Sequence, residues 1–386
     1  MNKVILIDVI NPRDNKREAI ERLEELEHLV STYGGFVIFK EIQKKTIPNY
    51  NYFLGTGKLE EIFKESVENE VNHIIINNIL KPSQIRNIQE LYIKYMKENH
   101  GLDMKEVDIN IEFWDRIDLI LKIFQKHAKT EEAKLEIELA SINHMGPRIF
   151  GMGMELSRQG GGVGTRGKGE TNTRIMQSHL KNQRIKIQEK INEFKKTREL
   201  HREDRIKRGL KTISLVGYTN SGKSTLLKTL TKKDVYIADE LFATLDTRIG
   251  KLWIANIMKE CLVVDTIGFI KDLPTELINS FKSTLEETIH ADLLFHVIDI
   301  SDPLYIDKIN TTENILKELL GEEKYQKKLK EILIFNKIDK IGDKELKIIK
   351  NNIEKNKIFK NKEKIFISAI SKINIEELKE IASKYI

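Results

Sequence analysis

Eight residues near the middle of the chain, 217–224, combine the residue types that hold a phosphate chain. Glycines let backbone N–H groups close around phosphates, a lysine reaches the β- and γ-phosphates, and a hydroxyl binds Mg²⁺. The segment follows the apolar run 213–216 and precedes a helical pattern, which is the order that such a loop requires. We therefore predict that the chain binds a nucleoside triphosphate here. The predicted contacts are Gly217, Tyr218, Thr219, Asn220, Ser221, Gly222, Lys223, Ser224 and Thr225.

A second motif, Asn-Lys-Ile-Asp at 336–339, closes the apolar run 332–335 and bears on which base is bound. The Asp339 carboxylate can accept hydrogen bonds from N1–H and from the exocyclic amine of guanine, whereas adenine offers no such pair of donors. Guanine is therefore the expected base. After another strand-like run near the C-terminus, a backbone N–H can reach the guanine oxygen. The predicted base-binding residues are Asn336, Lys337, Asp339, Ser368 and Ala369.

Between these motifs, the apolar run 262–264 leads into Asp-Thr-Ile-Gly at 265–268. We expect Ser224 to bind Mg²⁺, Asp265 to hold it through a water, and the N–H of Gly268 to meet the γ-phosphate. Phe269 stands where many GTP-hydrolysing enzymes carry the glutamine that orients the attacking water. A phenyl ring neither accepts nor donates that hydrogen bond, so slow intrinsic hydrolysis is predicted.

The segment before this strand offers a hydroxyl for a nucleotide-dependent switch. Thr244 is the predicted switch residue, which reaches Mg²⁺ only when the γ-phosphate is present. Thr247 is the competing candidate, and a structural threonine is the remaining alternative. Asn220 suggests K⁺ as a second cation, because GTPases with asparagine at this loop position often bind K⁺ where others insert an arginine. The predicted catalytic residues are Lys223, Thr244 and Gly268, and the predicted Mg²⁺ ligands are Ser224, Thr244 and Asp265.

The length and composition of the chain indicate how many domains it holds and in which cellular compartment it works. A chain of 386 residues is expected to hold two or three domains. Its single cysteine, Cys261, excludes a disulfide framework and heads an apolar run, so we interpret it as a small core residue. No segment approaches about 20 consecutive apolar residues, which argues against a membrane span. We expect a cytoplasmic protein, with room for a peripherally membrane-associated fraction.

Positive charge is concentrated in one part of the chain. Residues 158–211 include sixteen basic and six acidic residues, which gives this segment a net charge of +10 in a chain whose total net charge is +6. A basic face of this density attracts phosphate backbones and makes binding depend on salt. RNA is therefore a candidate partner, and a solvated lysine-rich helix is the alternative.

Periodicity divides the chain into three blocks and predicts an α/β fold class. Apolar runs alternate with helical patterns over 1–110, which predicts a small α/β domain. Helical spacing over 111–208, interrupted by a Gly-rich loop at 146–169, predicts a long helical hairpin. Residues 209–386 alternate strands and helices, as a doubly wound, mostly parallel P-loop domain does.

The Gly-rich loop at 146–169 allows three interpretations. A second phosphate loop would need a strand before it, and here a helical pattern precedes, so we reject that reading. Many glycines with interspersed Arg and Lys fit a segment that orders on RNA or against the nucleotide domain. A flexible linker is the alternative.

In combination, these motifs resemble the HflX family of ribosome-associated GTPases, within the Obg-HflX-like superfamily of P-loop GTPases. The likeness covers nearly the whole chain, and the segments that carry it are 54–61, 115–124, 134–140, 217–225, 241–246 and 265–274. Two departures stand out. The family usually continues Arg-Gly-Pro-Gly-Glu-Thr, whereas this chain has Arg-Gly-Lys-Gly-Glu-Thr at 166–171 and a different continuation. The chain also ends soon after residue 369, which leaves no room for the extra C-terminal domain of some members.

The resemblance implies a GTPase that binds the large ribosomal subunit and 70S ribosomes, hydrolyses GTP to GDP and phosphate, and splits or rescues stalled ribosomes. It further implies that the N-terminal and helical parts reach ribosomal RNA near the peptidyl-transferase region. Two alternatives stay open: a GTP-dependent ribosome-assembly or RNA-binding checkpoint factor, and an ATP-using RNA remodeller that works through the N-terminal block.

Overall fold

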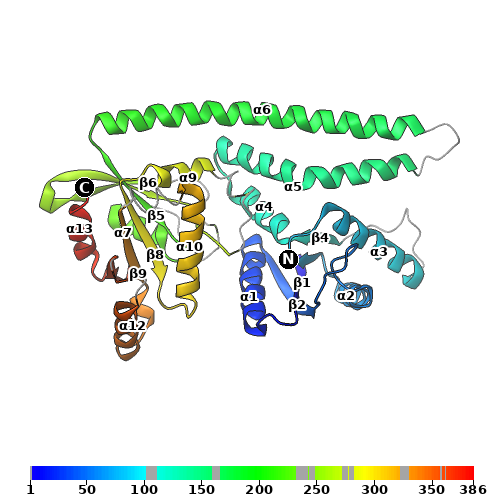
Figure 1. Cartoon of the computed structure of the whole chain (residues 1–386), viewed down its shortest axis with the longest axis horizontal. Helices are drawn as coiled ribbons and strands as arrows, with labels where there is room; N and C mark the ends of the chain where they lie inside the picture. Colours follow the sequence, from blue (N-terminus) through cyan, green and yellow to red (C-terminus); the bar gives the residue numbers. More distant parts are fainter. Residues whose placement is uncertain are drawn as a thin grey trace. The chain divides into compact units, whose positions relative to one another are not determined.

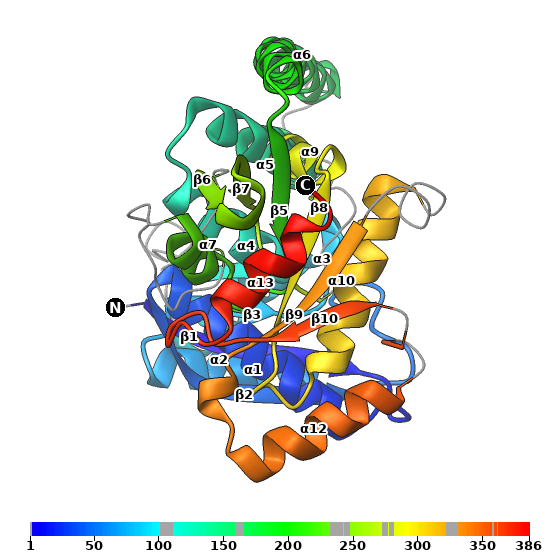
Figure 2. The same cartoon turned by 90° about the vertical axis from the view of Figure 1, so that its left-hand side faces the viewer.

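The computed structural model describes residues 2–100, 111–158, 166–231, 242, 248–271, 277, 282–321, 330–356, 359–360 and 362–386. The chain divides into two compact units (Figures 1 and 2). One contains Met1–Lys126 and Leu135–Lys190, and the other contains His127–Lys134 and Ile191–Ile386. The division passes through two long helices, so each of these helices contributes to both units.

The first unit contains a parallel four-stranded sheet in the order β2-β1-β3-β4. The strands are β1 (Asn2–Ile10), β2 (Gly35–Lys44), β3 (His73–Ile76) and β4 (Glu112–Asp115), and the helices between them are α1 (Lys16–Tyr33), α2 (Thr56–Glu68) and α3 (Pro82–His100). α1 begins where the Asn15 side chain accepts the N–H of Arg17, and it ends at Gly34, whose φ is 97°. β1 and β3 lie inside the sheet, and their apolar residues are almost all buried.

Three helices follow: α4 (Arg116–His127), α5 (Glu131–Arg158) and α6 (Arg166–Lys207). α5 and α6 run in opposite directions along each other (Figure 1). Within the first unit Gln183 donates to Glu138 at 2.7 Å, and within the second Arg198 pairs with Glu132. These contacts are typical of a helical hairpin. The domain boundaries at residues 111 and 208 remain a prediction from the sequence.

The structure differs from the expected helical block in two places. Residues 112–115 form β4, which pairs with β3, and the helix starts only at Arg116. A short buried run of this kind cannot be assigned to strand or helix from periodicity. The expected loop at 146–169 is helical up to Arg158 and again from Arg166, with residues 159–165 outside the described part. The glycines lower helix propensity by only about 1 kcal/mol each, which the packing of the rest of a helix can outweigh.

The second unit is built on a six-stranded sheet in the order β10-β9-β8-β5-β7-β6. Its strands are β5 (Lys211–Val216), β6 (Arg248–Ile254), β7 (Lys259–Asp265), β8 (Leu293–Asp299), β9 (Lys330–Asn336) and β10 (Glu363–Phe366). Its shorter helices are α7 (Lys223–Thr231), η1 (Ala255–Ile257), α9 (Lys282–Ile289), α10 (Tyr305–Leu320), η2 (Ile338–Lys340), α12 (Asp343–Lys355) and α13 (Ile375–Ser383). β6 pairs antiparallel with β7, and the other pairs are parallel. The predicted α/β class and mostly parallel P-loop domain are confirmed.

Both faces of this sheet are covered by helices. Along β8, Leu293 and Phe295 enter a core cluster with residues of α7 and α13, whereas Leu294 enters one with residues of α9 and α10. Successive side chains of a strand point to opposite faces, so the two clusters lie on the two faces of the sheet. A sheet buried on both sides leaves the ends of its strands for a binding site.

Cys261 lies in β7 with a fully buried side chain. Burial, and to a lesser extent the charge of Glu260, raises the pKa of its thiol to about 12. The residue is therefore the small core side chain that was predicted. In the part of the chain that the structure describes, no helix is both long and apolar enough to cross a membrane.

Candidate nucleotide-binding site

The phosphate-loop sequence lies between β5 and α7, and two of its glycines are required by close contacts. Gly217 has φ of 146°, and a Cβ on it would lie 2.2 Å from the carbonyl oxygen of Val297 in β8. Gly222 has φ of 96°, and a Cβ there would lie 2.3 Å from Nδ2 of Asn336. Any larger residue would have to push these neighbours away in a backbone region that side chains disfavour. The loop thus has its tight turn only with these glycines.

The ammonium group of Lys223 is held by the loop itself. Its Nζ donates to the carbonyl oxygens of Gly217, at 3.1 Å, and Tyr218, at 2.8 Å. Burial, opposed by the negative charge of Asp265, lowers the pKa of Lys223 to about 8. The lysine is therefore still mainly cationic at neutral pH, inside a loop where N–H groups and a positive charge suit phosphate oxygens.

A hydroxyl and a carboxylate meet beside the lysine. Oγ of Ser224, in the first turn of α7, donates to Oδ2 of Asp265, the last residue of β7, at 2.6 Å. Mg²⁺ prefers oxygen ligands of this kind together with substrate phosphates, so the pair fits that ion. Thr244, the third predicted ligand, and its competitor Thr247 lie outside the described residues.

The segment after Asp265 packs directly on the phosphate loop. Phe269 N–H donates to the carbonyl oxygen of Gly217 at 3.1 Å, and its own carbonyl accepts from Thr219 N–H at 2.8 Å. A Cβ on Gly268 would lie only 2.8 Å from the backbone Cα of Thr219 and 2.9 Å from Nζ of Lys223, so this position also needs glycine. The backbone of Gly268 is therefore next to the lysine, where its N–H was predicted to act.

The side chain of Phe269 points into the protein core. It is 1% exposed and packs with Val216, Leu285 and Leu294. Its ring therefore contributes apolar burial, which favours folding. Its side chain supplies no polar group to the loop, whereas its backbone N–H and carbonyl both bond to it.

The Asn-Lys-Ile-Asp motif is tied to the phosphate loop by two side chains. Nδ2 of Asn336 donates to the Ser221 carbonyl at 2.9 Å, and its Oδ1 accepts from Ala369 N–H at 3.0 Å. Nζ of Lys337 donates to the Asn220 carbonyl at 2.7 Å. These bonds join the ends of β5 and β9 with the loop that follows β10.

The carboxylate of Asp339, the predicted base reader, lies next to Ser368, which was also predicted to contact the base. Oδ1 of Asp339 accepts a hydrogen bond from Oγ of Ser368, and the same Oγ accepts from the N–H of Ser371. A carboxylate held in this way has a defined orientation before a base arrives, which reduces the cost of ordering it. Thr229 in α7 also donates to the carbonyl of Ala369 at 2.8 Å.

Sequence reasoning missed one residue of this region, Asp299, and one contact of Tyr218, which was predicted only as part of the phosphate loop. Asp299, at the end of β8, pairs with Nζ of Lys337 at 2.7 Å. The hydroxyl of Tyr218 accepts the N–H of Lys271 at 2.7 Å. Asp299 could have been found by its place at the carboxyl end of a parallel strand, where ligands of such sheets bind. No sequence signal distinguishes the role of the tyrosine hydroxyl.

Alanine substitutions at two glycines test the loop geometry. Gly222→Ala is expected to lower the free energy of unfolding by about 1–3 kcal/mol, because the new Cβ meets Nδ2 of Asn336 at positive φ. Gly342→Ala is the matched control, because a Cβ there has no neighbour within 4 Å. Urea unfolding of both variants measures the difference. Equal stabilities would contradict the close approach of Asn336 to the loop.

The phosphate loop follows the central strand β5, an acidic residue ends β7, and the base motif ends β9. This arrangement defines a P-loop GTPase domain. Matches to known families agree along the chain: "GTP-binding GTPase N-terminal" over 20–125, "GTP-binding GTPase Middle Region" over 127–205, and "50S ribosome-binding GTPase" over 212–337.

Individual relatives are similar over most of the chain. GTPase HflX of Caldanaerobacter subterraneus subsp. tengcongensis is 38% identical over 379 residues, which cover 98% of this chain and 79% of that protein. GTPase HflX of Escherichia coli is 37% identical over 329 residues, covering 85% and 72%. The chain belongs to the HflX family of GTPases. The crystal structure of SsGBP in complex with GDP is 25% identical with a TM-score of 0.51, covering 100% of this chain and 98% of that one.

Proposed function

We propose that this chain binds GTP and Mg²⁺, hydrolyses GTP to GDP and phosphate on the large ribosomal subunit, and acts in splitting or rescuing stalled 70S ribosomes. The observation that carries the enzymatic part is the convergence of Lys223, Ser224 and Asp265 beside the Asn336 motif. The ribosomal part rests on the family match named "50S ribosome-binding GTPase" and on the basic helix α6.

The reaction we propose is in-line attack of water on the γ-phosphate. Lys223 and the loop N–H groups stabilise the charge that spreads over the phosphate oxygens, and the N–H of Gly268 contributes a further hydrogen bond to the γ-phosphate. Ser224, Thr244 and, through a water, Asp265 would hold Mg²⁺, which would neutralise part of the phosphate charge. Asp339 and Lys337 orient the guanine.

We propose that the missing water-orienting group comes from the ribosome. The side chain of Phe269 is buried and has no hydrogen-bonding group, so the isolated protein is expected to hydrolyse GTP slowly. A group supplied by a partner in Ras-type GTPases accelerates hydrolysis by about 10⁵-fold, or about 7 kcal/mol, which sets the upper scale of the effect.

The charge of α6 supports an RNA partner. In the described part from residue 175 onward, α6 is exposed at most positions, and most of its basic side chains lie on the surface. Arg198 and Arg205 are exceptions, because they are largely buried and pair with Glu132 and Glu287. Exposed members include Lys181, Arg184, Lys186 and Lys190. Contacts of lysine and arginine to phosphates weaken steeply with salt, so binding to the large subunit is expected to fall as salt rises.

GTP turnover by the purified chain, alone and with large ribosomal subunits, tests this function. Stimulation by at least about 10²-fold is expected, well inside the range that a partner-supplied group provides. Small ribosomal subunits serve as the control for unspecific RNA effects. No stimulation by large subunits would contradict the proposal and favour an assembly or checkpoint role.

We also propose K⁺ as a second cation at the loop. Asn220 is exposed, has φ of 58° and precedes the close turn at Gly222. GTP turnover is expected to be higher in K⁺ than in Na⁺. Asn220→Gly removes the side chain and tolerates the positive φ, so it is expected to abolish this difference without unfolding the loop. Equal rates in both salts would exclude a role for K⁺.

A further inference from the structure

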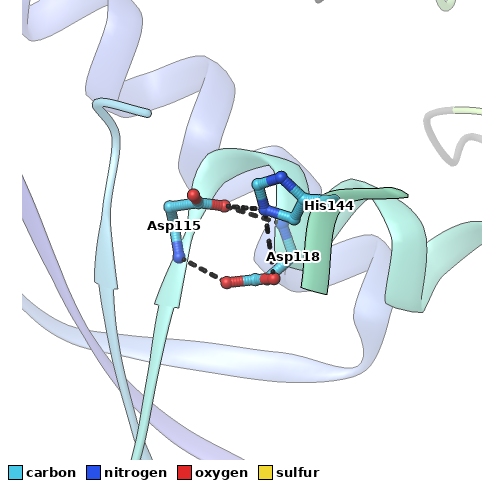
Figure 3. Close-up of side chains that lie close together, drawn as sticks. All are labelled: Asp115, Asp118 and His144. Atoms are coloured by element: carbon cyan, nitrogen blue, oxygen red, sulfur yellow. Dashed lines mark hydrogen bonds and ion pairs between the residues drawn. The ribbon is translucent and has the colours of Figure 1, made fainter. Parts of the chain in front are cut away.

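Three side chains of the first unit meet at one point outside the nucleotide site (Figure 3). Asp115 ends β4, Asp118 lies in the first turn of α4, and His144 comes from α5. Nε2 of His144 is 3.2 Å from Oδ1 of Asp115 and 3.4 Å from Oδ1 of Asp118. The side chains are only 0%, 4% and 11% exposed, respectively. Two carboxylates and one imidazole are thus brought together by three separate elements.

These separations are those of ligands around a small metal ion. Carboxylate oxygens and imidazole nitrogens lie at about 2.0–2.2 Å from Zn²⁺, so tetrahedral geometry places two such ligands about 3.3–3.6 Å apart. Of the two nitrogen–oxygen distances, 3.4 Å lies within this range and 3.2 Å lies just below it. One ligand atom from each of the three residues lies within 4.8 Å of the others.

Both carboxylates are held in place by backbone groups. Oδ2 of Asp118 accepts the N–H of Asp115 at 3.0 Å, and Oδ1 of Asp115 accepts the N–H of Asp118 at 2.9 Å. Oδ2 of Asp115 also accepts the N–H of Leu80 at 3.3 Å. Hydrogen bonds of this kind orient metal ligands in advance and raise affinity, because less freedom is lost when the ion binds.

The geometry points to a divalent transition-metal site formed by Asp115, Asp118 and His144. Two carboxylates and a neutral imidazole carry a charge of −2, which a divalent cation balances. Imidazole suits Zn²⁺ and related ions, whereas Mg²⁺ and Ca²⁺ prefer oxygen ligands alone, so Zn²⁺ is the probe of choice. The ion would join the end of β4 and the start of α4 to α5, within one unit of the chain. Its fourth position would be open to water.

In this structure the three side chains are held together as an ion pair. Burial disfavours the charged imidazole, but hydrogen bonds and charges from Asp115 and Asp118 outweigh it and raise the pKa of His144 to about 9. A bound divalent cation would take the place of this ion pair.

Calorimetric titration of the full chain with Zn²⁺ tests the site. The protein is first stripped with a chelator, and the titration is run without nucleotide and with Mg²⁺ present to occupy oxygen-only sites. One Zn²⁺ per chain is expected. Asp118→Asn is expected to weaken binding by at least about 10-fold and to remove the rise in melting temperature that Zn²⁺ causes.

Two variants serve as matched controls. Glu112→Gln alters an exposed carboxylate at the start of β4, which lies 3.9 Å from His73 in β3, so it is expected to leave zinc binding unchanged. Ser224→Ala removes a predicted Mg²⁺ ligand of the nucleotide site and should likewise preserve the stoichiometry. Absence of zinc binding to the wild-type chain would show an ion pair only and overturn the proposal, whatever the folding of the variants. Binding that Asp118→Asn leaves intact would overturn it as well.

Discussion

Lys223→Ala is expected to reduce GTP turnover, alone and with large ribosomal subunits, by at least about 10²–10³-fold. The ammonium group is buried and held by the carbonyls of Gly217 and Tyr218, so it stands ready for the phosphates without reorganisation. A preorganised charge that acts on the transition state in a water-poor site commonly contributes about 3–4 kcal/mol. Single-turnover measurements with saturating GTP separate this loss from weaker nucleotide binding.

The matched control is Lys228→Ala in the same helix, α7, where the lysine side chain is exposed. It removes one positive charge without touching the loop, so turnover should stay within about twofold, as for surface substitutions generally. ATP hydrolysis that survives Lys223→Ala would instead support a remodeller that works through the N-terminal unit. Retained GTP turnover would show that the loop is not the reaction centre.

Asp339→Asn is expected to lower affinity for GTP by about 10²–10⁴-fold and to create a preference for xanthosine triphosphate. The carboxylate accepts two donors of guanine, and hydrogen bonds to a charged group contribute about 1.5–3 kcal/mol each. Asparagine presents a donor and an acceptor instead, which match the oxygen and the N–H of xanthine. Competition between the two nucleotides in an equilibrium binding assay measures the change.

Two features of the site sharpen this experiment. Ser368 donates to Asp339, and an asparagine oxygen can keep that bond, so the loop after β10 should retain its structure. Asp343→Asn at the start of α12 is the matched control, because it removes a nearby exposed carboxylate. Unchanged preference for GTP in Asp339→Asn would refute the assignment of this residue as the base reader.

Much of the nucleotide domain could be predicted from local sequence. The loop at 217–224 needs glycines where φ is positive, a strand before it and a helix after it. All three features can be recognised in one continuous stretch of the sequence. The order of the three motifs along alternating strands and helices then predicts a doubly wound sheet. The HflX family and the α/β class followed from this information.

Other features were decided only by tertiary packing. Strand β4 exists because β3 lies beside it, and the core position of Phe269 depends on α9 and α10 covering one face of the sheet. The pair of Asp299 with Lys337 and the meeting of Asp118 with His144 join residues that are 38 and 26 positions apart. Contacts of this kind depend on strand order and helix packing, which periodicity in a single sequence does not specify. The sequence by itself determined the phosphate-binding chemistry, because that chemistry is local, whereas the three-dimensional fold decided which distant side chains meet.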